Sequence, residues 1–252
     1  MTEKPKEIRK VAIIARKGGV GKTSICKGLA DSLRRREMKS LLIDWDIERN
    51  LTKTIGGTEK ATQTITDFLS TGNIDAHTVN EYIDLIPGSP LVNERIFEDM
   101  QEDKMSLLLE DLNDRHVIVD LNHNSVYSVK QTKVLCDTFI IVFTGSISAV
   151  QGAMIVAHDI LERNKLYKKN PSRQIRFCFV HNMYIERPTS RIIDKEIVDR
   201  HPTIPLFHVN HRRIVLDLEN EKRFLSDSKK DLDSRNLLLG EYDVILDWIL
   251  KG

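Results

Sequence analysis

The 252-residue sequence contains few of the residues that mark disulfide-rich, membrane-spanning or strongly basic proteins. Its three cysteines, Cys26, Cys136 and Cys178, are odd in number and widely spaced within apolar stretches, which argues against a disulfide framework or a cysteine metal site. No signal peptide and no run of 18 apolar residues is present, so we expect a cytoplasmic protein whose thiols lie in its core. The net charge of +1 excludes a strongly basic protein without excluding a basic face.

No internal repeat, low-complexity tract or linker rich in proline, glycine and serine divides the chain. We therefore expect one domain over residues 1–252. Apolar strand patterns alternate with helical ones, which predicts an α/β fold with a mostly parallel, twisted sheet and helices on both faces. The strands are expected to begin near Val11, Leu41, Tyr82, Val117, Phe139 and Arg176.

A glycine-rich segment follows the first expected strand. Residues 16–23 depart from the P-loop pattern G-x-x-x-x-G-K-[ST] at Arg16 but match K-G-G-x-G-K-[ST] at every position. Behind them, Ile25, Leu29 and Leu33 recur with helical spacing, which predicts a helix whose positive end faces a bound anion. Strand, glycine loop and helix in this order predict a nucleoside triphosphate site. The alternative is a glycine-rich turn beside a basic residue.

The segment supplies the groups that a triphosphate and its magnesium ion need. Its glycines permit positive φ, so that successive N–H groups can point at phosphate oxygens. Lys22 is expected to reach the β- and γ-phosphates, and the Thr23 hydroxyl to bind Mg²⁺. The candidate nucleotide-binding residues here are Gly18, Gly19, Val20, Gly21, Lys22, Thr23 and Ser24. Lys17 has no necessary role within its own subunit and joins them only through the resemblance described next.

The segment resembles the deviant Walker A loop of the ParA/MinD superfamily of P-loop ATPases. The resemblance implies ATP and Mg²⁺ as ligands. In that family the extra lysine, here Lys17, is called the signature lysine and reaches across a dimer interface to the partner's nucleotide. A homodimer that forms with ATP is therefore implied, and a solvated loop lysine is the alternative.

The resemblance continues through residues 40–52, which are similar to the family segment L-L-I-D-x-D-P-Q-G-N-x-T that leads into switch I. Asp46 takes the position of the family's catalytic aspartate, which orients or activates the attacking water beside the metal. The family's Pro, Gln and Gly are replaced here at residues 47–49, which leaves the rate of hydrolysis open. The implied catalytic residues are Lys17, Lys22 and Asp46.

A second acidic position ends the apolar strand at residues 116–120. Asp120 has the Walker B arrangement, in which the carboxylate contacts Mg²⁺, commonly through a water. The family usually continues D-x-P-P, whereas residues 121–123 read Leu, Asn and His, so switch II is unusual here. The candidate metal residues are Thr23, Asp46 and Asp120. Capping of a strand end is the alternative for these acids.

Later segments resemble the family less closely. Residues 136–142 are similar to the strand after switch II, and residues 148–152 to the helix start that follows it. Residues 177–184 look like the strand and loop that approach the adenine. Asn182 is the candidate base contact, because an amide can pair with an adenine edge, although asparagine also favours turns. Residues 205–223 resemble the family's last conserved loop only loosely.

Basic residues gather in the C-terminal part of the chain. The candidate DNA-binding residues are Arg212, Arg213, Lys222 and Arg223. Acidic residues are interspersed among them, so on charge alone a mixed solvated face is favoured. The resemblance favours DNA, because ParA dimers bind nucleoid DNA non-specifically through C-terminal basic residues. It implies a cytoplasmic, nucleoid-associated protein.

The resemblance implies a ParA-like ATPase for plasmid or chromosome partition, with hydrolysis stimulated by a ParB-like centromere-binding partner. The chain resembles the short form without an N-terminal helix-turn-helix domain. One alternative is a MinD-like positioning ATPase at a membrane. That class ends in a basic amphipathic helix, whereas residues 242–250 carry acids and predict a docked helix, so no membrane contact is expected. The other alternative is an ATP-dependent interaction scaffold with weak turnover, suggested by the altered switch segments.

Overall fold

An eight-stranded sheet forms the centre of the protein. The computed structural model describes residues 8–55, 63–71, 76–91, 114–121, 136–169, 174–229 and 231–251. The strand order is β3-β4-β2-β5-β1-β6-β7-β8, with every neighbouring pair parallel except β3 and β4. The strands are β1 (Lys10–Ile14), β2 (Ser40–Trp45), β3 (His77–Asn80), β4 (Ile83–Ile86), β5 (His116–Leu121), β6 (Thr138–Phe143), β7 (Arg176–Tyr184) and β8 (Leu206–Asn210).

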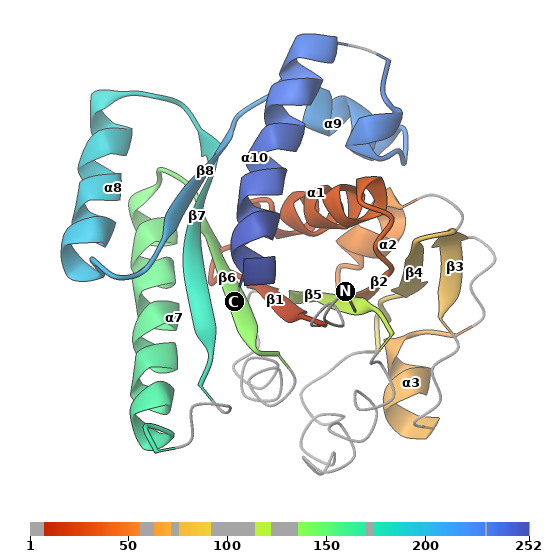
Figure 1. The fold of residues 1–252 in the computed structure, drawn as a ribbon, viewed down its shortest axis with the longest axis horizontal. Helices are drawn as coiled ribbons and strands as arrows, with labels where there is room; N and C mark the ends of the chain where they lie inside the picture. The colour runs from red at the N-terminus through yellow and green to blue at the C-terminus, as the bar shows by residue number, and fades with distance from the viewer. Residues whose placement is uncertain are drawn as a thin grey trace, which may run out of the picture.

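Helices cover both faces of the sheet, as the alternating pattern predicts. Figure 1 shows α7 and α8 on one side of β6, β7 and β8, and α1 and α10 on the other. The helices are α1 (Lys22–Arg35), α2 (Asn50–Thr54), α3 (Ile65–Thr71), α7 (Ile147–Leu166), α8 (Pro188–Arg200), α9 (Arg213–Asn220) and α10 (Leu232–Lys251), with a 3-10 turn, η3 (Leu225–Asp227). The predicted α/β fold class is confirmed.

The central strands are buried along their whole length, which explains why their sequences read as continuous apolar runs. Every residue of β2, β5 and β6 is buried. The helical spacing of Ile25, Leu29 and Leu33 has the expected consequence, because all three lie in the core on α1. Each expected strand start lies within one residue of an observed one.

Two edge strands were not predicted from the sequence. β3 reads HTVN and has no buried residue, and β8 reads LFHVN with one. Strands at the edge of a sheet are partly exposed and short, so they lack the apolar run that identifies a central strand. β3 pairs antiparallel with β4, and this is the departure from an all-parallel sheet.

Other sequence-based expectations have clear outcomes. Cys26, Cys136 and Cys178 are free and buried, as predicted for core thiols. Across the described residues, no helix is both long and apolar enough to cross a membrane. The apolar face of α10 is buried in the core, as expected for a docked helix. Residues 122 and 123 of the unusual switch II segment lie outside the described residues.

Candidate nucleotide-binding site

The loop between β1 and α1 turns sharply because two of its glycines adopt positive φ. Gly19 has a φ of 72° and Gly21 a φ of 87°, a region that other residues enter at a cost. A Cβ at Gly21 would also overlap the side-chain amide of Asn182. Since α1 begins at Lys22, directly after the loop, its unpaired N–H groups and positive end lie beside the loop.

A cavity of about 270 Å³ opens beside this loop. Lys22 lies in its wall and is only 7% exposed. Every expected loop residue except Lys17 and Val20 lines the cavity. The wall consists of Gly18, Gly19, Gly21, Lys22, Thr23, Ser24, Asp46, Glu48, Asn50, Thr54, Asn182, Met183, Val209, Asn210, His211, Arg212, Val215, Glu219 and Tyr242. A concave site of this kind, with polar groups converging from several elements, is where a small ligand binds.

Asp44 is a structural acid at the carboxyl edge of the sheet. It accepts hydrogen bonds from the backbone N–H and the hydroxyl of Thr52, at 2.8 and 2.6 Å. The Thr52 hydroxyl oxygen in turn accepts from the N–H of Gly88, at 2.8 Å. Burial raises the pKa of Asp44 to about 6 although these hydrogen bonds oppose the rise. Asp44 therefore fixes α2 against β2 and the loop after β4.

Asp120 lies beside Asp44 because the parallel register of β2 and β5 pairs the two residues. Its Oδ2 accepts a hydrogen bond from the hydroxyl of Thr23, at 2.7 Å. Its Oδ1 is buried and has no strong hydrogen-bond donor within the described part of the chain, and the thiol of Cys26, a weak donor, lies beside this carboxyl. Burial raises the pKa of Asp120 to about 7, the negative charge of Asp44 adds to the rise, and Lys22 opposes it.

These features fit a magnesium ion. A buried carboxylate oxygen without a strong donor is costly, and a divalent cation both supplies the partner and stabilises the ionised form. Mg²⁺ prefers oxygen ligands and keeps several waters, so one carboxylate, one hydroxyl and phosphate oxygens form an ordinary site. Asp120 and Thr23, already in contact, would hold it.

Asp46 lies in the cavity wall at the end of β2 and is buried. Its Oδ1 accepts a hydrogen bond from the N–H of Glu48, at 3.0 Å, within the turn that leads to α2. Glu48 and Asn50 also line the cavity, and the Asn50 amide donates to Glu48 across 2.9 Å. The segment that departs from the family pattern thus forms part of the cavity wall beside Asp46.

Asn182 joins β7 to the loop. Its amide donates to the carbonyl oxygen of Val20, at 2.8 Å, and both residues are buried. Asn182 also lines the cavity, so it lies where a ligand can contact it. The base contact itself stays a prediction.

The cavity wall formed by the end of β8 and by α9 was not predicted from the sequence. There the N–H and amide of Asn210 and the guanidinium of Arg212 all donate to Glu241 of α10, at 2.9, 2.5 and 3.1 Å. Ser24 donates to Glu219 of α9, at 2.5 Å. Both segments fall within residues 205–223, whose loose resemblance to the family's last conserved loop was the sequence signal for this wall. It gave no motif from which individual residues could be assigned.

Lys17 lies apart from Lys22. Its Nζ donates to the hydroxyls of Ser146 and Ser148, at 2.9 Å each, at the start of α7. Ser146 is the N-cap of that helix. Within its own subunit, Lys17 is therefore attached to the β6–α7 loop and does not line the cavity, whereas Lys22 does.

The four candidate DNA-binding residues do not share one environment. Arg212 lies in the cavity wall and pairs with Glu241, with 20% of its side chain exposed. Arg213, Lys222 and Arg223 are exposed. The Arg223 guanidinium pairs with Glu221 at 3.3 Å. Phosphate contact by these residues stays a prediction, and Arg212 has a second role as a wall of the cavity.

Comparison with known proteins identifies the family. The profile of a family described as an AAA domain matches residues 8–173, well over half of the chain. The chain belongs to this family. The AAA-domain protein is also 24% identical over 262 residues to Uncharacterized protein MJECL24 of Methanocaldococcus jannaschii, a match that covers 96% of this chain and 98% of the relative.

Solved structures share the fold of this AAA-domain protein over almost its whole length. An ATP complex of Cyanothece McdA has a TM-score of 0.81 and 16% identity, with 98% of each chain covered. A plasmid partition protein of Borrelia burgdorferi has a TM-score of 0.69 and 24% identity, covering 98% and 99%. The septum site-determining protein MinD of Pyrococcus horikoshii, complexed with Mg-ADP, has a TM-score of 0.71 and 16% identity, covering 94% and 96%. These likenesses confirm the predicted fold, and the family shown for the chain is the AAA-domain family.

Proposed function

We propose that the protein is a ParA-like partition ATPase that dimerises with ATP and binds DNA without sequence preference. The observation that carries the proposal is the position of Lys17, which lies outside its own cavity on two serine hydroxyls. A lysine that does not line its own cavity has no evident role there, and the deviant Walker A resemblance assigns it to the nucleotide of a second subunit. A plasmid partition protein and McdA share the fold.

The cavity is the proposed ATP site. The loop N–H groups and the positive end of α1 suit the phosphates, and Lys22 places a positive charge in the same wall. The remaining wall, with Asn182 and Asn210, offers amide groups for the base or sugar. The McdA and MinD structures named above contain ATP and Mg-ADP, respectively, which supports this assignment.

Hydrolysis is proposed to depend on Asp46 and Lys22. A carboxylate in the cavity wall can hold a water in line with the terminal phosphate, and a lysine stabilises the charge that develops there. Thr23 and Asp120 are the proposed magnesium residues, with Asp46 near them at the end of the neighbouring strand. When bound, Mg²⁺ neutralises charge on the phosphate oxygens.

The exposed residues Arg213, Lys222 and Arg223 are the proposed phosphate contacts on DNA. Arg213 is the first residue of α9, and Arg212 before it lines the cavity. Ligand binding in the cavity therefore acts directly on the helix that carries a basic surface residue, which is a route for ATP to control DNA binding. A ParB-like protein is the proposed partner that stimulates hydrolysis, and the nucleoid is the proposed location.

A duplex-binding titration with ATP, ADP or no nucleotide, at two salt concentrations, tests the proposal. Binding should need ATP, ignore sequence and weaken steeply with salt, because each neutralised phosphate releases counterions. Arg213→Glu with Lys222→Glu should weaken binding to all duplexes alike, whereas Lys168→Glu with Lys169→Glu, the same charge change on two exposed residues after α7, should not. No binding with ATP at low salt, together with ATP-dependent sedimentation on anionic vesicles, would favour the membrane alternative.

A further inference from the structure

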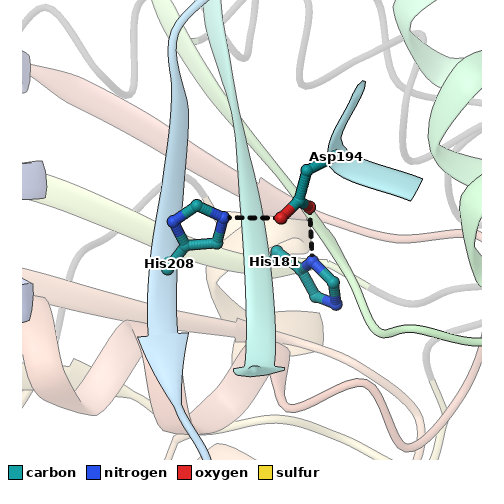
Figure 2. A group of neighbouring side chains, drawn as sticks. All are labelled: His181, Asp194 and His208. Atoms are coloured by element: carbon teal, nitrogen blue, oxygen red, sulfur yellow. Dashed lines mark hydrogen bonds and ion pairs between the residues drawn. The ribbon is translucent and has the colours of Figure 1, made fainter. Parts of the chain in front are cut away.

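Two histidines and an aspartate meet on the face of the sheet that α8 covers. His181 of β7 and His208 of β8 are register partners on neighbouring parallel strands, so their side chains leave the sheet on the same side. Asp194 of α8 lies between the two rings (Figure 2). Its Oδ1 is 2.7 Å from Nδ1 of His181, and its Oδ2 is 2.9 Å from Nε2 of His208. Three consecutive elements, β7, α8 and β8, thus each bring one side chain to the same point.

Aromatic side chains hold the two imidazoles in place. The ring of Phe143 packs on His181, with centroids 4.7 Å apart. Tyr184 packs on both histidines, with its centroid 5.0 Å from that of His181 and 4.3 Å from that of His208. The His181 side chain is 1% exposed and the His208 side chain 39% exposed. The cluster is therefore oriented by packing on its inner side and open to solvent on its outer side.

We propose that His181, Asp194 and His208 form a binding site for a divalent transition metal, of which Zn²⁺ fits best. One nitrogen from each histidine and one carboxylate oxygen already lie within 4.8 Å of one another. Ligands around a tetrahedral Zn²⁺, with bonds of roughly 2.0–2.2 Å, are separated by roughly 3.3–3.5 Å. Zn²⁺ would therefore require the Asp194 carboxylate to turn and its contacts with the two rings, now 2.7 and 2.9 Å, to lengthen to roughly 3.3–3.5 Å.

The donor set selects the class of metal. Imidazole nitrogens suit Zn²⁺ and its neighbours in the transition series, whereas Mg²⁺ and Ca²⁺ prefer oxygen ligands. Two histidines, one aspartate and a water on the exposed side complete four-coordination.

This site is distinct from the proposed nucleotide site but lies next to it in the chain. Side chains alternate along a strand, so His181 faces α8 while Asn182 reaches the carbonyl oxygen of Val20 on the other side. After His208, β8 leads within a few residues to Asn210 and Arg212 of the cavity wall. A bound metal would therefore link β7, β8 and α8 to one another, on the side of the sheet opposite that wall.

The test is a Zn²⁺ titration of the metal-stripped 252-residue chain, with Mg²⁺ in excess and no nucleotide, followed by calorimetry and thermal unfolding. One Zn²⁺ per chain should bind. At about a hundredfold excess over the Kd, the Tm should rise by about 5–10 °C. Co²⁺ in place of Zn²⁺ should give the visible absorption bands of a four-coordinate site.

Variants locate the metal. His208→Ala, at the exposed ligand, and Asp194→Asn should each weaken Zn²⁺ binding by at least about tenfold and reduce the Co²⁺ bands. His158→Ala, an exposed histidine on α7, should bind like the parent chain, and Asp120→Asn should too. No Zn²⁺ binding by the parent, unchanged binding in both ligand variants, or loss of binding in Asp120→Asn alone would each overturn the assignment.

Discussion

Gly28 of α1 lies directly against the ring of Tyr242 on α10. A Cβ at position 28 would fall well inside van der Waals contact with three atoms of that ring. Tyr242 is buried and also lines the cavity, so it has little room to move. The close approach of these two helices therefore depends on the absence of a side chain at Gly28.

Gly28→Ala should lower the free energy of unfolding by about 1–3 kcal/mol, because overpacking a filled interface forces side chains or helices apart. The matched control is Gly240→Ala on α10, where nothing lies within 4 Å of the added Cβ. That change should be neutral or stabilise by up to about 1 kcal/mol, since alanine favours a helix over glycine. Urea unfolding of the two variants measures the difference. Equal stabilisation by both would show that α1 and α10 are not in close contact at Gly28.

Lys27, also on α1, predicts a pH dependence of stability. Its Nζ donates to the carbonyl oxygen of Thr54, at 2.8 Å. Burial lowers its pKa from 10.5 to about 8, although Glu219 and Asp31 oppose the shift. Between these two pH values the unfolded chain binds more protons at this site than the folded chain, so the contribution of Lys27 to stability rises with pH.

The measurement is chemical unfolding of the parent chain and of Lys27→Met at a series of pH values. Other groups titrate in both proteins and cancel in the difference. The stability of the parent relative to the variant should increase by about 2 kcal/mol from about pH 7 to about pH 10. A difference that is constant over this range would show that Lys27 titrates normally in the folded protein.

The central strands of the sheet could be predicted because buried parallel strands read as apolar runs in the sequence. β2 and β5 each contain a run of three apolar residues, and in each an aspartate follows that run, one residue before the carboxyl end of the strand. The loop motif then fixed where the site had to be, since it requires a strand before it and a helix after it. Edge strands such as β8 gave no such signal, because half-exposed positions tolerate polar residues.

The far wall of the cavity and the histidine cluster were not predictable for a different reason. Glu241 bonds Asn210 and Arg212 from a helix that begins much later in the chain. His181, Asp194 and His208 are brought together by strand register and by the position of α8. Such contacts depend on three-dimensional packing, and single residues with no motif spacing do not reveal it. Lys17 was identified by the motif, but its serine partners were not.

Asp46→Ala should retain ATP binding while phosphate release falls by about a hundredfold or more, because the lost carboxylate acts on the water and not on affinity. The nucleotide-bound dimer should accumulate. Glu48→Gln is the matched comparison, since it changes a neighbouring wall residue to the family's amide and leaves intact the N–H that bonds Asp46. It should hydrolyse ATP at least as fast as the parent. Parental turnover in Asp46→Ala would make the catalytic assignment wrong and favour the scaffold alternative.

The two loop lysines should separate binding from dimerisation. Lys22→Ala removes the charge in the cavity wall and should weaken ATP binding by about 10- to 100-fold, the range for a charged hydrogen bond. Lys17→Ala removes a side chain held outside the cavity by Ser146 and Ser148. It should therefore keep ATP affinity within about threefold and lose ATP-dependent dimerisation.

Equilibrium nucleotide titration and sedimentation velocity, each with and without ATP, measure the two properties on the same samples. Ser148→Ala is the control, because it removes one partner of Lys17 and keeps the lysine. If Lys17 acts in the partner subunit, Ser148→Ala should dimerise as well as the parent or better, since one of the two hydrogen bonds that keep Lys17 in its own subunit is removed. Equal loss of ATP affinity in Lys17→Ala and Lys22→Ala would instead place both lysines in the same subunit's site, and the partition proposal would lose the observation on which it rests.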